Sequence, residues 1–245
     1  MDDLPTRERP PLTGDFGLSP LESARPSESM AEQVFRVLRS SIVTLRLTPG
    51  TALSEQDIAT RLEVSRQPVR EAFIKLSEVG LVRIMPQRGT FVVKISPKAV
   101  TDARFVREAV ECAIARRAAD EIADEAVETL HDLIAQQKAA AKAANAEDFF
   151  MLDEAYHRAL AEGAGCAYAW KVIGEAKAQM DRVRFLRLSE ATPMDHLIAH
   201  HQDILDAIVA QDADAAEQAM KIHLRGILQS LPRLAQVFPD LFEAG

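Results

Sequence analysis

The stretch Val64–Phe73, Val-Ser-Arg-Gln-Pro-Val-Arg-Glu-Ala-Phe, constrains the fold of its surroundings most strongly. Ser65 stands where a helix N-cap is expected, and apolar residues follow it at three- and four-residue steps. Arg66, Gln67 and Arg70 are left facing outward near the start of this helix, and side chains of these types suit base edges and phosphates. Taken alone, the pattern also fits a surface helix with two solvated arginines.

The segments before this helix favour the first interpretation. Apolar residues stepping by four and three predict a helix over about 29–46, and Pro49-Gly50 predicts the turn that ends it. Ser54 is placed to cap a short helix, and a tight turn at Glu63-Val64 leads into the next one. Two short helices joined by a few residues, the second with outward Arg and Gln side chains, have the spacing of a helix-turn-helix.

The segment after the helix predicts a β-hairpin. Gly80 ends the helix, and residues 81–85 and 90–95 alternate with β-branched and aromatic side chains around Pro86-Gln-Arg-Gly89. A hairpin directly after a recognition helix is a wing. Arg88 and Gly89 at its tip would supply a cation and a close backbone approach to the minor groove.

The charge distribution agrees with a nucleic-acid partner for this part only. The whole chain has a net charge of −8, but residues 34–95 carry ten Lys/Arg and five Asp/Glu, a net of +5. Residues 96–245 carry a net of −9. A basic segment joined to an acidic one indicates a DNA-binding module beside a domain with another task.

Residues 49–92 resemble the winged-helix domain of GntR-family bacterial transcription regulators. The resemblance rests on Pro49-Gly50, Leu53-Ser54-Glu55, Ile58-Ala59, Leu62, Val64-Ser65-Arg66, Pro68-Val69-Arg70-Glu71-Ala72, Leu76, Gly80-Leu81-Val82, Pro86 and Arg88-Gly89-Thr90-Phe91-Val92. It implies that operator DNA is contacted by Ser65, Arg66, Gln67 and Arg70 on the helix and by Arg88 and Gly89 in the wing.

The rest of the chain carries only helical signals. Six helices are expected, over about 98–121, 124–144, 147–163, 167–188, 194–210 and 213–235. The expected organisation is a disordered tail over 1–27, a winged-helix domain over 28–96, an all-helical domain over 97–238 and a short tail over 239–245. There is no secretory signal and no apolar run of the roughly 20 residues that span a bilayer. With only two cysteines, this predicts a cytoplasmic protein with reduced thiols.

One carboxylate and three imidazoles fall on apolar stripes of three different predicted helices. Asp153 and His157 are i, i+4 neighbours, His201 lies between Leu197 and Ile204, and His223 follows Met220. A divalent cation would satisfy all four polar groups together. A single histidine on such a stripe is more often a hydrogen-bonded core residue, so the prediction depends on the joint occurrence.

The resemblance extends to this half, which is similar to the FCD ligand-binding domain of FadR-type GntR regulators. It is carried by Leu152-Asp153-Glu154-Ala155-Tyr156-His157, His201-Gln202-Asp203-Ile204-Leu205 and Ala219-Met220 with His223-Leu224. It implies a metal ion, zinc or nickel, held by Asp153, His157, His201 and His223. Arg107, on an apolar stripe with Glu111, is either half of a buried ion pair or a clamp for an effector carboxylate; the resemblance favours the clamp.

The sequence therefore predicts a mainly α protein: a winged helix-turn-helix of three helices plus a β-hairpin, followed by an all-α six-helix domain. The expected function is that of a homodimeric DNA-binding repressor, not an enzyme. Its binding to double-stranded operator DNA would be controlled by a small organic acid or sugar acid bound with the metal. Two alternatives are a regulator that senses the metal itself and a metal-dependent hydrolase.

Overall fold

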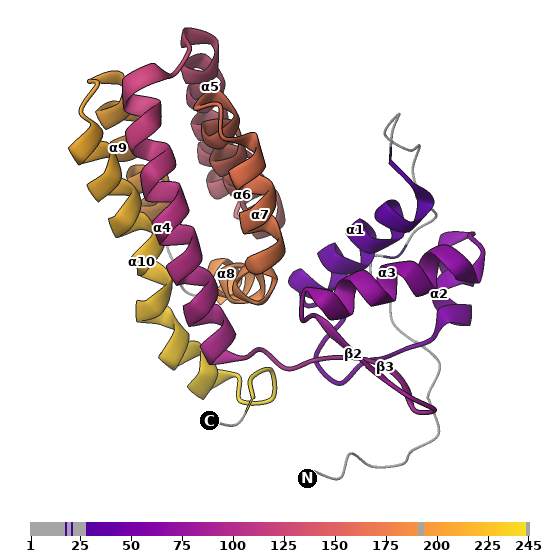
Figure 1. Ribbon diagram of the computed structural model, residues 1–245. Coiled ribbons are helices and arrows are strands. Elements are labelled where there is room, and N and C mark those ends of the chain that lie inside the picture. Colours follow the sequence, from indigo (N-terminus) through magenta and orange to yellow (C-terminus); the bar gives the residue numbers. More distant parts are fainter. Residues whose placement is uncertain (1–17, 19–20, 22–27, 191–193, 244–245) are drawn as a thin grey trace. The chain divides into compact units, whose positions relative to one another are not determined.

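The computed structural model describes residues 28–190 and 194–243, together with Leu18 and Leu21. Apart from those two leucines, the tail expected over 1–27 lies outside the described residues. Residues 244–245, at the end of the expected C-terminal tail, lie outside them as well. The described residues fall into two compact units that divide between Lys94 and Ile95 (Figure 1).

The first unit is built on three helices: α1 (Met30–Val43), α2 (Glu55–Leu62) and α3 (Arg66–Glu78). Ser29 begins α1 with a capping box in which Glu32 reciprocates, and the hydroxyl of Ser54 accepts from the third residue of α2. Apolar side chains of α1 and α3 face each other and are fully buried, among them Val34, Leu38, Val69 and Leu76. The predicted stripe of the recognition helix is therefore the core of this unit.

The expected hairpin is present, as β2 (Val82–Met85) and β3 (Gly89–Val92), but it belongs to a three-stranded antiparallel sheet of order β1-β3-β2. The added strand, β1 (Ala52–Leu53), lies between the turn predicted at Pro49-Gly50 and the helix cap predicted at Ser54, where no strand was expected. Its register pairs Ala52 with Phe91 and Leu53 with Thr90. A third strand supports a hairpin that would be marginal by itself.

The second unit contains seven helices among its described residues: α4 (Pro97–Glu121), α5 (Asp124–Lys142), α6 (Ala146–Gly163), α7 (Ala167–Ala176), α8 (Ala178–Glu190), α9 (Met194–Val209) and α10 (Ala213–Val237). The longest two, α4 and α10, pack side by side (Figure 1), α9 packs against both α10 and α5, and α5 packs against α6. The winged-helix plus all-helical fold class is thus confirmed. None of the described helices is long and apolar enough to span a membrane.

One predicted helix, 167–188, is two helices in the structure. It is interrupted at Lys177, whose Nζ is buried and paired with Asp181, 2.8 Å away, and with Glu154. No proline marks this break, so the sequence pattern gave no sign of it beyond Gly174. The break turns α8 so that Met180, Arg184, Arg187 and Leu188 line one pocket.

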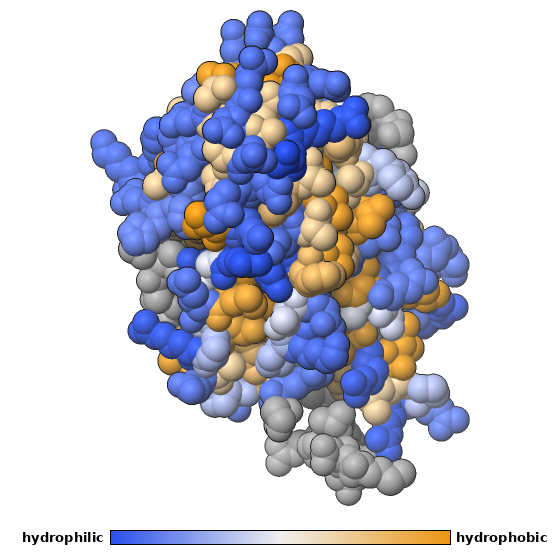
Figure 2. Space-filling view, turned by 60° about the vertical axis from the view of Figure 1, so that its left-hand side comes forward, coloured by the Kyte–Doolittle hydropathy of each residue, from blue (hydrophilic) through white to orange (hydrophobic). Residues whose placement is uncertain are grey.

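Residues 239–243, which belong to the expected C-terminal tail, fold back onto the start of their own unit. The amide of Ile95 donates to Leu241 O at 2.8 Å, the amide of Glu243 donates to Ile95 O at 2.9 Å, and Phe242 is buried. Figure 2 shows one face of the molecule, which is mainly hydrophilic with scattered apolar patches.

Candidate functional site

The N-terminal end of α3 is an exposed polar surface. Ser65 is the N-cap by its backbone, but its hydroxyl makes no capping hydrogen bond, and the first turn of the helix has no acidic residue. Ser65, Arg66, Gln67 and Arg70 are all exposed, whereas Val69 between them is buried. Free amides at a helix start favour an anion, and two arginines beside them add to that preference.

Two carboxylates hold these side chains. Glu55 on α2 accepts from Arg66 Nη2 at 2.9 Å and from both Nε and Nη2 of Arg70 at 3.0 Å. The hydrogen bonds from Arg70 hold the pKa of Glu55 below its usual value, despite the opposing effect of partial burial. Gln67 Nε2 donates to Glu71 at 2.8 Å. The sequence patterns did not identify Glu55 as a partner of the arginines.

The expected wing tip is the β2–β3 turn. The amide of Arg88 donates to Met85 O at 3.0 Å, which closes the turn, and the Arg88 side chain is exposed. Gly89 has a φ of 112°, a conformation that side-chain-bearing residues rarely adopt. These two residues therefore stand at the end of a short projecting ribbon.

In the second unit, the four predicted ligands come together. Asp153 and His157 come from α6, His201 from α9 and His223 from α10, and one donor atom of each lies within 4.8 Å of all the others. All four side chains are buried. His157 Nε2 and His223 Nε2 are 3.1 Å apart, and His201 Nε2 lies 3.5 Å from Asp153 Oδ1.

Residues of three further helices hold these side chains from behind. Gln137 Oε1 on α5 lies 2.8 Å from His201 Nδ1, and Glu111 Oε2 on α4 lies 2.7 Å from His157 Nδ1. An ion pair with Arg184 on α8 engages Oδ2 of Asp153. Groups of this kind orient imidazole and carboxylate ligands and set the tautomer of each histidine. Of these three residues, the sequence pattern singled out Glu111, as the possible ion-pair partner of Arg107.

Electrostatics in this cluster favour neutral imidazoles of His201 and His223 beside a charged carboxylate of Asp153. Burial lowers the pKa of His201 to about 3 and lowers the pKa of His223 as well. Burial is the largest influence on Asp153 and opposes its ionisation, but the combined effect of its neighbours, Arg184 foremost among them, lowers the pKa of that carboxyl. These are the protonation states in which His and Asp bind a metal ion.

The donor set fits a divalent metal ion. Nε2 of His201 is buried without a hydrogen-bond partner among the described residues, which is costly for a polar atom. Two nitrogens that are each about 2.1 Å from one ion lie roughly 3.0–3.4 Å apart at cis-octahedral to tetrahedral angles. The observed 3.1 Å between His157 Nε2 and His223 Nε2 falls in that range. Nitrogen and oxygen donors of this kind suit zinc and nickel.

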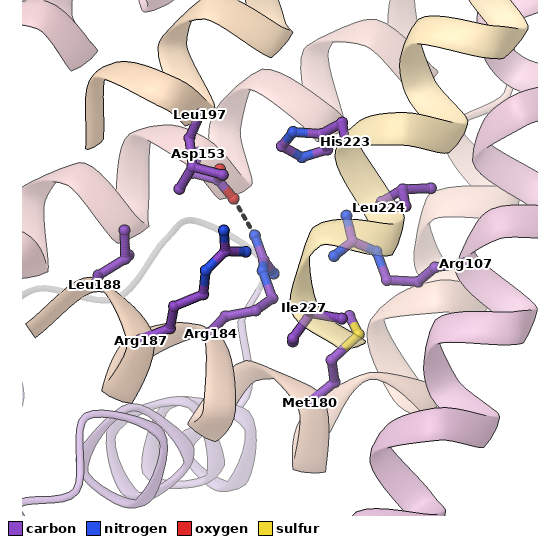
Figure 3. A pocket seen from close by; sticks show the side chains of 10 residues that line it. All are labelled: Arg107, Asp153, Met180, Arg184, Arg187, Leu188, Leu197, His223, Leu224 and Ile227. Atoms are coloured by element: carbon purple, nitrogen blue, oxygen red, sulfur yellow. Dashed lines mark hydrogen bonds and ion pairs between the residues drawn. The ribbon is translucent and has the colours of Figure 1, made fainter. Parts of the chain in front are cut away.

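A small cavity of about 40 Å³ adjoins two of these residues. Figure 3 shows Asp153 and His223 on one side of it, and the three arginines of its lining, Arg107, Arg184 and Arg187, with their guanidinium groups turned toward it. The remaining lining is apolar and comes from Met180, Leu188, Leu197, Leu224 and Ile227.

Arg107 forms the buried ion pair that was one of its two predicted roles, and it also lines the cavity. Nη2 donates to Glu111 at 3.0 Å and Nε also contacts that carboxylate, so the buried ion pair exists. The same guanidinium lines the cavity. Through Glu111, Arg107 is also connected to His157. Arg107 could therefore contact a bound anion without leaving Glu111.

Comparisons with known proteins identify the family of each of the two units. Residues 30–92 match the family model described as "Bacterial regulatory proteins, gntR family", and residues 102–226 match the FCD domain. The chain is 43% identical over 217 residues to the HTH-type transcriptional repressor RspR of Escherichia coli K12, covering 89% of this chain and 95% of that protein. It is 26% identical to the gluconate operon transcriptional repressor of Bacillus licheniformis, over 72% of this chain and 74% of the relative.

A solved structure, E. coli McbR/YncC, superimposes with a TM-score of 0.74 and covers 86% of this chain and 99% of its own, at 18% identity. At that identity the likeness concerns the fold alone.

Proposed function

Because the chain belongs to the gntR family of bacterial regulatory proteins and carries an FCD domain, we propose that it is a repressor whose operator binding is controlled by a small carboxylate held with a divalent metal ion. The chain is a DNA-binding transcription regulator, as its relatives are. The relatives are transcription regulators and not enzymes, which argues against the hydrolase alternative.

The DNA contacts we propose are Ser65, Arg66, Gln67 and Arg70 at the start of α3, with Arg88 and Gly89 in the wing. Their exposure and the open amides of the first turn support this assignment. Because one recognition helix covers only a half-site, we also propose that the protein acts as a homodimer on a two-fold operator.

The metal ligands we propose are Asp153, His157, His201 and His223, with zinc or nickel as the ion. Three of the four already have a partner that orients the donor atom, which makes the cluster preorganised for a cation. When bound, the ion would supply a Lewis-acid centre that attracts a carboxylate oxygen. The chain's own residues hold the donor atoms in place, and burial favours the neutral imidazoles of His201 and His223.

The observation that carries the effector proposal is the cavity beside these ligands. Its polar lining consists of two of the four metal-ligand candidates and three arginines, a set that favours an anion and that includes the planar forks suited to a carboxylate. A volume of about 40 Å³ has room for roughly three water molecules. An acid of few heavy atoms therefore fits as the side chains stand, and a sugar acid requires α8 side chains to move. The name of the B. licheniformis relative connects that protein to gluconate, a sugar acid.

The small volume also favours a second candidate function, in which the metal itself is the signal. The experiment that separates the two is a melting-temperature screen of the zinc- or nickel-loaded protein against small monocarboxylates, dicarboxylates and sugar acids. An acid at 100 times its dissociation constant adds about 2.7 kcal/mol to the free energy of unfolding.

DNA binding is then measured with metal alone and with each stabilising acid at fixed metal. Release of DNA by an acid only in the presence of metal supports the proposal. Release by metal alone supports the metal sensor. No response to any acid or metal contradicts both.

A further inference from the structure

Glu55 occupies an unusual place in the DNA-binding unit. It is the first residue of α2, yet its carboxylate lies between the two arginines that project from α3. Oε2 accepts from Arg66 Nη2 at 2.9 Å and from Arg70 Nη2 at 3.0 Å, while Oε1 accepts from Arg70 Nε at 3.0 Å. One side chain therefore sets the position of two cations of the exposed surface.

The contact with Arg70 leaves a defined part of that side chain open. Glu55 takes the edge formed by Nε and Nη2, and among the described residues no other partner of Arg70 is found. The opposite edge, Nη1 with the second proton of Nη2, is a two-donor fork on a side chain that is 55% exposed. Two parallel donors on a planar group match O6 and N7 of guanine in the major groove, which is the commonest specific contact of arginine with a base.

Stabilisation of the unit is a weak explanation for this arrangement. The side chains of Arg66 and Arg70 are 58% and 55% exposed, and exposed ion pairs contribute little to folding. Orientation is the larger consequence, because a free arginine samples many rotamers and must lose them on binding. An arginine already held along one edge loses fewer, and its remaining fork points in one direction.

We propose that Glu55 is a positioning residue that aims the open edge of the Arg70 guanidinium at a guanine in each operator half-site. The inference rests on the proposal that α3 reads DNA. It assigns Glu55 to specificity rather than affinity, since a carboxylate near DNA opposes phosphate binding in general.

The test uses the full chain and a library of randomised 30-base-pair duplexes, because it requires no knowledge of the operator. Selected sequences are compared for the wild type, Glu55→Gln, Arg70→Ala and the control Glu78→Gln. Glu78 is the last residue of α3, is exposed and pairs with neither arginine. Its replacement by glutamine therefore removes the same charge as Glu55→Gln without affecting Arg66 or Arg70.

We expect the wild type to select a guanine at a fixed position of each half-site and Arg70→Ala to lose that preference. Glu55→Gln should reduce the preference for guanine over other bases at that position by at least about fivefold, which is the lower end of what a two-donor contact contributes. Preferences at the other positions, and every preference of Glu78→Gln, should be unchanged. A structural role for Glu55 would instead change all positions together.

Other outcomes overturn the inference. Glu55→Gln with an intact guanine preference shows that Arg70 needs no positioning. Tighter binding to all sequences with unchanged preferences shows that Glu55 only screens charge. A wild type without sequence preference, or an Arg70→Ala variant that selects like the wild type, shows that α3 is not the reader and overturns both proposals.

If Glu55→Gln melts at a lower temperature than the wild type, Arg70→Lys provides the second variant. Lysine keeps the charge but cannot engage Glu55 and guanine with two edges. It should lose the guanine preference while keeping its affinity for random DNA.

Discussion

Gln137 holds the imidazole of His201 in the orientation that a metal ligand needs. Its Oε1 lies 2.8 Å from His201 Nδ1, and its Nε2 donates to Leu152 O at 3.2 Å. A proton on Nδ1 that is donated to Gln137 leaves the lone pair of His201 on Nε2, which faces Asp153. Replacing Gln137 by leucine removes this acceptor but keeps a side chain of similar size.

We expect Gln137→Leu to weaken binding of Zn²⁺ or Ni²⁺ by about 10- to 100-fold, the usual effect of losing a partner behind a histidine ligand. That range corresponds to about 1.4–2.7 kcal/mol of binding free energy. Stability of the metal-free protein should also fall, because Leu152 O and His201 Nδ1 lose their partner at a cost of about 1–3 kcal/mol each. Gln136, the preceding residue, is exposed, so Gln136→Leu is a matched control that should change neither quantity.

Trp170 provides the assay. It is the only tryptophan of the chain, and its ring is parallel to that of His157 at a centroid distance of 6.3 Å. Ni²⁺ bound at the cluster should quench its fluorescence, so a titration in the presence of a competing chelator gives the dissociation constant. Equal dissociation constants for Gln137→Leu, Gln136→Leu and the wild type would refute the reasoning that His201 is a ligand oriented by Gln137.

Three further predictions test other parts of the structure. Arg66→Ala should weaken binding to all DNA sequences and lower the slope of log affinity against log salt by about one, as expected for one lost phosphate contact; an unchanged slope in a salt titration would contradict that role. Cys112 should resist alkylation by iodoacetamide at pH 8, because burial raises the pKa of its thiol to about 11 and leaves roughly one part in a thousand as thiolate. Mass spectrometry should find the label on the partly exposed Cys166 first, and equal labelling rates would contradict the burial argument. Phe242→Ala should lower the unfolding free energy by about 3 kcal/mol, since it empties a buried site against Ile95; a melting curve like that of the wild type would show that the C-terminal residues do not pack there.

The sequence alone was sufficient for features that depend on local periodicity. The spacing of apolar residues around Ser65 located a helix whose outward side chains are exposed in the structure, and Gly80 located its end. The same periodicity placed one carboxylate and three histidines on the inner faces of α6, α9 and α10. A face of a helix follows from its 3.6-residue repeat, and buried faces of packed helices must meet, so the four side chains could be grouped before their distances were known.

Tertiary structure decided which groups hold those side chains. Gln137 and His201 are 64 positions apart, and no local pattern connects them. The contacts of Glu55 with Arg70, of Arg184 with Asp153 and of Ile95 with Phe242 likewise depend on how separate elements pack. The break at Lys177 has the same origin, since an ammonium group buried between carboxylates of α6 and α8 is satisfied only in the folded unit. The periodicity of a helix states which residues face inward, but only packing determines the partner that each inward polar group finds.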